Sequence, residues 1–210
     1  MVYKCYVATL AMGLLLSGSV FAAQEVYTAS NKETKINWRG YKIIKKYDHK
    51  GTINLLPSKK SQITFKDDKP VKAEFYVDMH SIVTTDDMDA KDKAKLVGHL
   101  KSDDFFGVNQ KGNEISTLVL DQFTRKSGNS WDVKGKMTVK GITKPINLKI
   151  EFEKSGKKLT GNAEFAFNRT DFNVMYNSKS LLKKMSDKVI ADDIELKINL
   201  VAEKTEENKS

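Results

Sequence analysis

Cysteine is nearly absent from this 210-residue chain, in which Cys5 is the single example. Cys5 precedes an apolar run, so a cut after that run leaves a mature chain without any thiol. Such a chain forms no disulfide, uses no thiolate nucleophile and holds no cysteine-ligated metal. Its stability then depends on a hydrophobic core, and the remaining ~188 residues are enough to bury one.

Arginine is also scarce, occurring at Arg39, Arg125 and Arg169. The formal net charge of +9 comes mainly from lysines that are dispersed among acidic residues. Nucleic-acid-binding proteins usually have a concentrated basic surface, often with arginines that contact base edges. We therefore expect no nucleic-acid partner. A dispersed basic surface favours transient contact with anionic membrane headgroups instead.

The uncharged apolar run Tyr6–Leu16 is too short to cross a bilayer, which takes about 20 helical residues. It follows Lys4 and precedes Val20-Phe21-Ala22, in which small residues lie three and one before a cleavage point. A positively charged N-terminal region, an apolar central region and a cleavage site with small residues are typical of a secretory signal peptide. We expect a signal peptide over residues 1–22 and a single domain over 23–210, exported to the periplasm or secreted.

Motifs for catalysis and metal binding are missing from the sequence. We find no Ser–His–Asp order, no G-x-S-x-G and no glycine-rich phosphate loop. None of the histidines, His49, His80 and His99, has a second histidine at the spacing of a helical metal site. The acidic run Asp86–Asp92 lacks the glycine and final glutamate of a calcium loop, and its acids suit the start of a helix. We expect no enzymatic activity, no metal and no cofactor.

Alternation of apolar and polar residues is the dominant pattern. Val71–Met79, Lys144–Phe152 and Ile194–Leu200 alternate cleanly, as strands with one apolar and one solvated face do. Less regular strands are predicted over Thr34–Ile44, Gly51–Leu56, Gln62–Lys66, Glu114–Phe123, Ser130–Lys140 and Leu159–Asn168.

Two segments depart from this alternation. Asp86–Leu100 and Asn177–Met185 have apolar residues at helical spacing and are predicted to form short helices or ordered loops. The gaps between strands are short, which favours antiparallel neighbours. About nine such strands form either a two-sheet sandwich or a closed barrel, and closure alone removes exposed strand edges. The pattern by itself predicts an all-β fold and leaves both architectures open.

Several sequence blocks occur together, and their order and spacing extend over roughly Thr34–Glu203, which is nearly all of the expected mature chain. They resemble the motifs of the YceI-like family, although loop positions such as Asn173, where that family commonly has glycine, depart from its pattern. The blocks are FYVDMHSI at 75–82, GHLKSDDFF at 98–106, GKMTVKGITKPI at 135–146, NRTDF at 168–172 and DHKG at 48–51. The resemblance implies a lipocalin-like antiparallel β-barrel, exported to the periplasm, that binds a polyisoprenoid or a related amphiphilic chain in its lumen.

The resemblance also assigns roles to side chains, whereas alternation shows only that one face is apolar. Polar residues at the rim, His49, Arg169 and Tyr176, are expected to hold a quinone or phosphate headgroup. Arg169 and Asp171 are two residues apart and are expected on one strand face, so a structural ion pair or a turn anchor is the alternative to a headgroup role for Arg169. The residues expected to line an apolar lumen, or else to pack as an ordinary core, are Ile53, Leu55, Phe65, Phe75, Val77, Met79, Leu118, Leu120, Met137, Val139, Phe165 and Phe167.

The expected function is that of a non-enzymatic carrier or sequestering protein for a polyisoprenoid or an isoprenoid quinone. A secreted lipid-acting enzyme is the first alternative, and the missing nucleophile motif weighs against it. A stress or virulence accessory that acts through a protein partner is the second, and a large exposed apolar patch would indicate it. The sequence leaves homodimer formation open.

Overall fold

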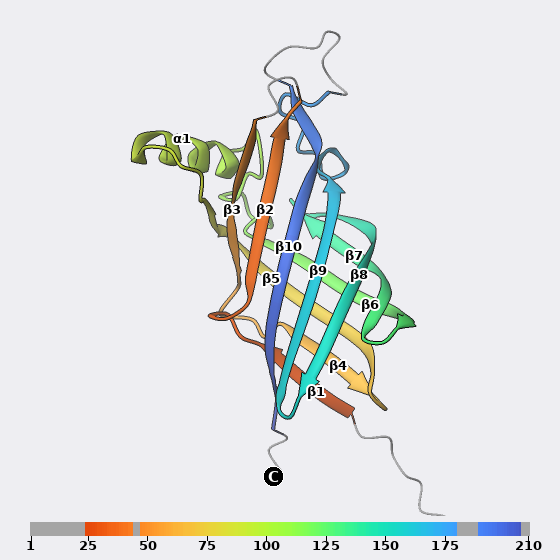
Figure 1. The fold of residues 1–210 in the computed structure, drawn as a ribbon. Helices are drawn as coiled ribbons and strands as arrows, with labels where there is room; N and C mark the ends of the chain where they lie inside the picture. Colours follow the sequence, from red (N-terminus) through yellow and green to blue (C-terminus); the bar gives the residue numbers. More distant parts are fainter. Residues whose placement is uncertain (1–23, 44–46, 180–188, 207–210) are drawn as a thin grey trace, which may run out of the picture.

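The computed structural model describes residues 24–43, 47–179 and 189–206, which form an elongated barrel with one helix projecting from its side (Figure 1). The expected signal peptide lies outside these residues, as does most of the expected helix Asn177–Met185. Within the described ranges, no helix combines the length and apolar character needed to cross a membrane.

Strands dominate the described residues, as the alternation predicts. All nine expected strands are present, and the expected helix within Asp86–Leu100 is α1 (Ala90–Lys101). The additional strand is β1 (Gln24–Ala29), which is short and lacks a clear alternation of apolar and polar residues. The other strands are β2 (Lys35–Lys42), β3 (Asp48–Leu55), β4 (Gln62–Lys66), β5 (Lys69–Thr84), β6 (Ile115–Ser127), β7 (Ser130–Val139), β8 (Ile142–Ser155), β9 (Lys158–Asn168) and β10 (Ile190–Lys204).

Strand pairing closes the sheet into a barrel and so decides between the two architectures. Eight antiparallel strands follow the order β5-β3-β2-β10-β9-β8-β7-β6, and pairing of β6 with β5 completes the ring. Towards the lower end in Figure 1, β4 pairs with the first half of β5, and β1 joins β4 to the last residues of β10. Every strand of the described ranges therefore pairs with a neighbour on each side over at least part of its length, which limits the strand edge that is free for aggregation.

Two backbone features help to set this pairing. Lys140 and Gly141 both have positive φ angles, of 53° and 70°, and they join β7 to β8 in a tight hairpin. Two-residue turns of this kind match the right-handed twist of the strands. At Gly51 in β3, a Cβ atom would lie 1.9 Å from the carbonyl oxygen of Val83 and 2.6 Å from the indole of Trp38. Glycine at this position therefore lets Trp38 pack directly against β3.

Aromatic rings and ion pairs fill the lower end of the barrel. Phe65 packs edge-to-face against Tyr27 and Phe152, with ring centroids 5.7 Å apart in each pair. The ammonium of Lys154 lies 4.1 Å from the centroid of the Phe65 ring and 2.6 Å from a carboxylate oxygen of Glu25. This end is closed by direct contact of side chains across the axis.

The helix α1 lies at the opposite, upper end and has its N-terminal part directed away from the barrel (Figure 1). Asp89 caps it, because its side chain accepts a 2.8 Å hydrogen bond from the backbone N–H of Asp92. The last turn packs on the barrel through the buried side chain of Leu100. The acids of Asp86–Asp92 thus serve helix capping and, as shown below, the orientation of a histidine.

Candidate functional site

An apolar cavity of about 170 Å³ lies inside the barrel, between the filled lower end and the upper end. Its wall is built by inward-facing side chains of the barrel strands together with the last turns of α1. Among the residues predicted to line a lumen, those in the wall are Ile53, Leu55, Phe75, Val77, Met79, Leu118, Met137, Val139, Phe165 and Phe167. Their contact with a ligand stays a prediction.

Partial exposure of inward side chains shows where the barrel is hollow. Phe75, Val77, Phe165 and Phe167 face inward, yet they are only half-buried because part of their surface borders empty space. On β9 the outward neighbours Glu164 and Ala166 are exposed, and Glu164 forms an ion pair with a lysine on β10, whereas the outward neighbours on β5 are half-buried. The alternation therefore separates a solvated outer face from a face that surrounds a void.

Two of the predicted lumen residues, Phe65 and Leu120, lie below the cavity and not in its wall. Phe65 belongs to the aromatic cluster at the lower end. Leu120 is fully buried and pairs with Ala73 on β5 and Gly135 on β7. Both side chains point inward as predicted, but at this level β1 and β4 complete the ring and the side chains meet at the axis.

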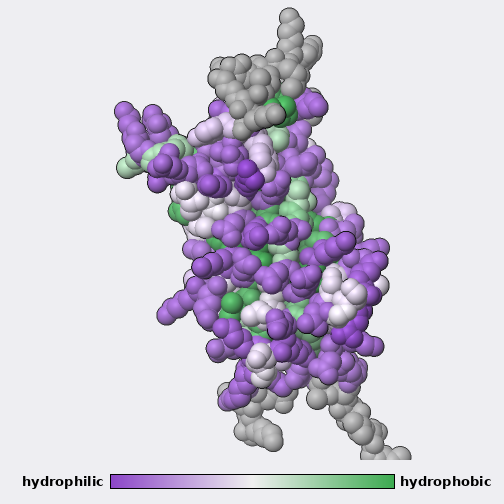
Figure 2. Space-filling view, in the orientation of Figure 1, coloured by the Kyte–Doolittle hydropathy of each residue, from purple (hydrophilic) through white to green (hydrophobic). Residues whose placement is uncertain are grey.

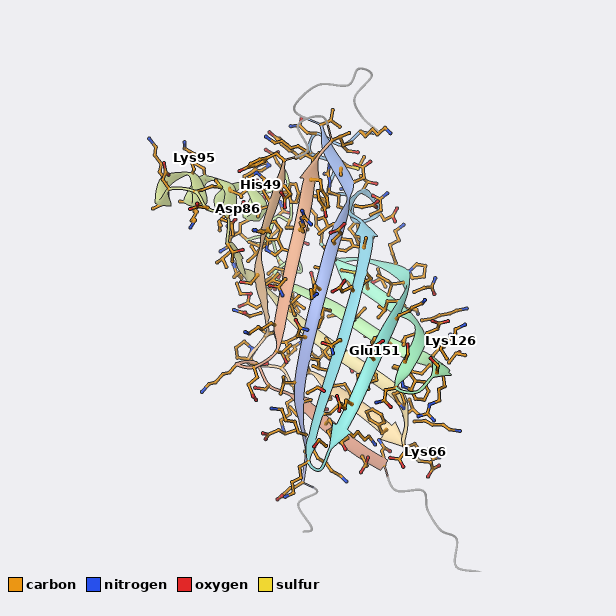
Figure 3. All side chains as sticks on the ribbon, viewed as in Figure 1. His49, Lys66, Asp86, Lys95, Lys126 and Glu151 are labelled. Atoms are coloured by element: carbon orange, nitrogen blue, oxygen red, sulfur yellow. The ribbon has the colours of Figure 1, made fainter. Side chains whose placement is uncertain are left out.

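His49 is at the upper rim of the cavity, next to Asp86 (Figure 3). Its Nδ1 atom lies 2.6 Å from Oδ2 of Asp86, while Oδ1 accepts a 3.0 Å hydrogen bond from the backbone N–H of Lys50. Burial raises the pKa of Asp86, but hydrogen bonds from His49, Lys50 and Thr84 outweigh burial, so the pKa lies below its usual value. An ionised Asp86 therefore fixes the orientation of the imidazole.

Arg169 borders the cavity, but its guanidinium is engaged by the protein itself. The side chain is fully buried and donates hydrogen bonds to the carbonyl oxygens of Val174 at 2.7 Å, Ala191 at 3.1 Å and Ile190 at 3.4 Å. Burial lowers its pKa, and the carboxylate of Asp192, 3.4 Å away, opposes that effect. The geometry makes Arg169 an anchor that ties its loop to β10.

The predicted pairing of Arg169 with Asp171 on one strand face is wrong. The two residues lie in a short 3₁₀ helix over Arg169–Phe172, in which Asp171 is exposed and the acidic partner of Arg169 is Asp192. The helix forms because the side chain of Asn168 accepts hydrogen bonds from the backbone N–H and the hydroxyl of Thr170, at 2.9 and 2.7 Å. Such local capping competes with a continued strand.

Tyr176, the third residue expected at a headgroup, lies outside the cavity wall. It is 40% exposed, and its ring centroid is 4.3 Å from that of His99. His99 itself does border the cavity and separates Tyr176 from the space inside. The structure thus brings His49 and Arg169 to the cavity and leaves Tyr176 on the surface.

Several polar residues of the wall were not among the predicted site residues. They include His99, in the last turn of α1, and Ser116, near the start of β6, and the others are Thr34, Tyr41, Lys42 and Thr117. Nε2 of His99 and Oγ of Ser116 are buried and have no hydrogen-bond partner within the described ranges. The signal for Ser116 was present, since it continues the inward alternation of Leu118 and Leu120.

Together, these features define a closed antiparallel barrel that surrounds an apolar cavity with a few polar groups in its wall. Residues 27–202 match the YceI-like domain, so the chain belongs to the YceI-like family, and the resemblance noted from the sequence motifs is confirmed. A UPF0312 protein from Pseudomonas putida strain GB-1 is 27% identical over 171 residues, which cover 78% of this chain and 80% of that protein.

Solved structures share the fold at low sequence identity. A polyisoprenoid-binding domain from Saccharophagus degradans superposes with a TM-score of 0.60 at 13% identity, covering 85% of this chain and 98% of that domain. BcnA from Burkholderia cenocepacia gives 0.58 at 16% identity, with coverage of 82% and 98%. The YceI protein of Campylobacter jejuni gives 0.53 at 17% identity, with coverage of 98% and 94%. At these identities the likeness establishes the architecture alone.

Proposed function

We propose that this protein binds a polyisoprenoid or a similar amphiphilic lipid, such as an isoprenoid quinone, in its barrel and sequesters or carries it unchanged. The observation that carries this proposal is the apolar cavity inside a closed barrel. An isoprenoid chain is nearly insoluble in water, and each methylene that it buries contributes ~0.8 kcal/mol. Membership of the YceI-like family and the likeness to a polyisoprenoid-binding domain support this ligand class.

The size of the cavity sets what it holds without rearrangement. Engineered apolar cavities of ~150 Å³ stay dry and bind a ring as small as benzene. At about 170 Å³, the cavity accommodates a short apolar segment in the present conformation. A longer chain must displace flexible wall residues, and Met79 and Met137 are unbranched side chains that adapt readily to such changes.

Binding without turnover fits the wall better than lipid hydrolysis does. The imidazole of His49 is bonded to a carboxylate, and in the described ranges no hydrogen bond joins the imidazole of either cavity histidine to a serine or threonine hydroxyl; the Ser102 hydroxyl donates to the backbone carbonyl of His99 instead. A role through a protein partner has less support, because hydrophilic residues cover most of the face in Figure 2 and apolar ones form small separate areas. The proposed location is the periplasm, which rests on the signal-peptide pattern of residues 1–22.

Native mass spectrometry tests the proposal directly. Protein purified gently from its own host is expected to carry an apolar molecule that organic extraction removes. The variant Leu196→Trp enlarges a side chain that faces the cavity and is expected to abolish uptake of an added isoprenoid. Lys197→Trp places the same ring on the exposed outer face and serves as the matched control. Equal uptake by both variants, or protein that is repeatedly empty, contradicts the proposal.

A further inference from the structure

The ladder between β8 and β9 stops part-way along both strands. They pair over Glu151–Ser155 and Lys158–Asn162, and in the described ranges no pair joins them above that point. Each strand keeps its other neighbour there, because β8 pairs with β7 and β9 pairs with β10. Figure 1 shows β8 and β9 diverging upward from the hairpin that they share. Residues 142–150 of β8 and 163–168 of β9 thus border a seam without ladder pairs, here called the β8–β9 seam.

Apolar side chains close the β8–β9 seam. Ile146, Leu148 and Ile150 of β8 face inward and are buried. Near the upper end of β9, the ring of Phe167 packs edge-to-face on that of Phe172 in the 3₁₀ helix, with centroids 5.6 Å apart. Apolar packing is non-directional, whereas paired strands lose hydrogen bonds when they part. The seam is therefore closed in this conformation, but it opens without the loss of ladder hydrogen bonds.

A second apolar cavity, of about 20 Å³, lies at the foot of the β8–β9 seam. Its wall includes Leu148 and Ala163, which belong to the seam, and the exposed Asn162 of the last ladder pair. It also has side chains in common with the wall of the main cavity, namely Phe75, Leu118, Phe165, Ile198 and Leu200. The space inside the barrel therefore extends from the main cavity into the wall at the seam.

Both ends of the barrel are held by contacts that the β8–β9 seam lacks in the described part of the chain. The aromatic and ionic contacts described above fill the lower end. At the upper end, the bond between His49 and Asp86 ties β3 to the segment before α1. The ammonium of Lys140 donates hydrogen bonds to the carbonyl oxygens of Asp103 at 3.2 Å and Phe105 at 2.9 Å, which tie the segment after α1 to the turn between β7 and β8.

We propose that the β8–β9 seam is a gate through which the apolar chain of the ligand enters and leaves the cavity, sideways through the barrel wall. This inference rests on the proposed function and names the path that the ligand takes. A gate of this kind limits the rates of uptake and release. It leaves the equilibrium affinity unchanged, because the seam is closed in the empty and in the occupied protein alike.

A covalent bridge across the seam tests the gate. Asn147→Cys and Ala166→Cys place thiols on the exposed outer faces of β8 and β9 above the last ladder pair, and a bismaleimide joins them. The matched control, Glu153→Cys with Thr160→Cys, is bridged in the same way between the same strands, at positions that already form a ladder pair. Both variants also carry a serine in place of the single native cysteine.

The bridge across the seam is expected to slow both uptake and release of a short-chain ubiquinone by about tenfold or more, with unchanged affinity, while the bridged control keeps wild-type rates. Quenching of tryptophan fluorescence measures these rates, since Trp38 borders the cavity. Leu148→Ala removes a side chain that closes the seam and is expected to raise both rates. Val133→Ala, at the ladder partner of Leu148 on β7, is its control and is expected to leave them unchanged.

The outcomes separate the gate from the proposed function. Wild-type rates in the protein with the bridged seam overturn the gate and place the passage at an end of the barrel, with binding itself intact. Equal slowing in the bridged control also overturns it. If the seam variant does not fold, unchanged rates in Leu148→Ala have the same consequence. Failure of the unmodified protein to bind either the ubiquinone or geranylgeraniol refutes the proposed function itself.

Discussion

The ion pairs at the lower end of the barrel make a strong prediction for pH-dependent stability. Glu25 accepts hydrogen bonds from Lys154 at 2.6 Å and from Lys204 at 2.5 Å, and these two contacts lower its pKa from 4.5 to about 2. A carboxylate whose pKa is depressed by folding contributes stability above its unfolded pKa and loses it as the pH falls through the folded value. The contribution of Glu25 is therefore complete above pH ~5 and declines towards pH 2.

The magnitude follows from the shift of the pKa. Each unit by which the folded pKa lies below the unfolded one is worth ~1.4 kcal/mol, so the change from 4.5 to about 2 corresponds to ~3 kcal/mol of unfolding free energy at neutral pH. The Glu25 side chain is 26% exposed, so solvent screening reduces this value, and we expect ~2 kcal/mol. The variant Glu25→Gln is expected to have a free energy of unfolding lower than that of the wild type by this amount at pH 7. The difference between the two proteins is expected to shrink by roughly half at pH 3.

Urea denaturation followed by tryptophan fluorescence, repeated from pH 7 to pH 3, measures this difference. The control is Glu206→Gln, because Glu206 pairs with Lys157 while both side chains are more than three-quarters exposed. It is expected to change stability within experimental error at every pH. Parallel loss of stability by wild type and Glu25→Gln between pH 5 and pH 3 would refute the assignment of this pH dependence to Glu25.

Three further predictions concern the packing and the cavity. Gly51→Ala forces a Cβ against the Val83 carbonyl and Trp38, and is expected to destabilise the fold by ~1–3 kcal/mol in urea denaturation; an unchanged midpoint contradicts the close approach. Arg169→Met leaves backbone carbonyls unpaired and is expected to cost ~3 kcal/mol or more, whereas a loss below 1 kcal/mol would show that its contacts are dispensable. Across isoprenoid alcohols of increasing length, calorimetric affinity is expected to rise about tenfold or more per added isoprene unit until the cavity is full, and a flat series excludes burial of the chain.

Strand positions were predictable because alternation is a local property of the sequence. Residues such as Ile146, Leu148 and Ile150 alternate with exposed neighbours, and burial on β8 follows that pattern. The choice between sandwich and barrel depends on pairing of β6 with β5, which no local pattern encodes. The family motifs supplied that architecture, and the match over residues 27–202 agrees with it.

The level of each side chain along the barrel axis was the least predictable part of the site. Phe65 and Phe75 both face inward, but Phe65 meets Tyr27 from β1, a strand without a clear pattern, whereas Phe75 borders the cavity. Arg169 follows a strand and was treated as part of it, although Asn168 and Thr170 carry a capping signal that starts a 3₁₀ helix. In both cases a short local feature, the strand β1 or the cap at Asn168, overrides what the alternation of apolar and polar residues predicts.

A hollow interior has an energetic cost that the rest of the barrel must offset. Side chains that border a void of about 170 Å³ lack the contacts they would make in a filled core, and those lost contacts destabilise the folded state. Closure of the sheet and the aromatic and ionic contacts of Phe65, Lys154 and Glu25 stabilise the lower end, away from this cavity. A side chain that fills the void restores the lost contacts. Under the proposed function, Leu196→Trp is therefore expected to raise the stability of the empty protein while removing its capacity to bind, and thermal unfolding of both proteins measures the first effect.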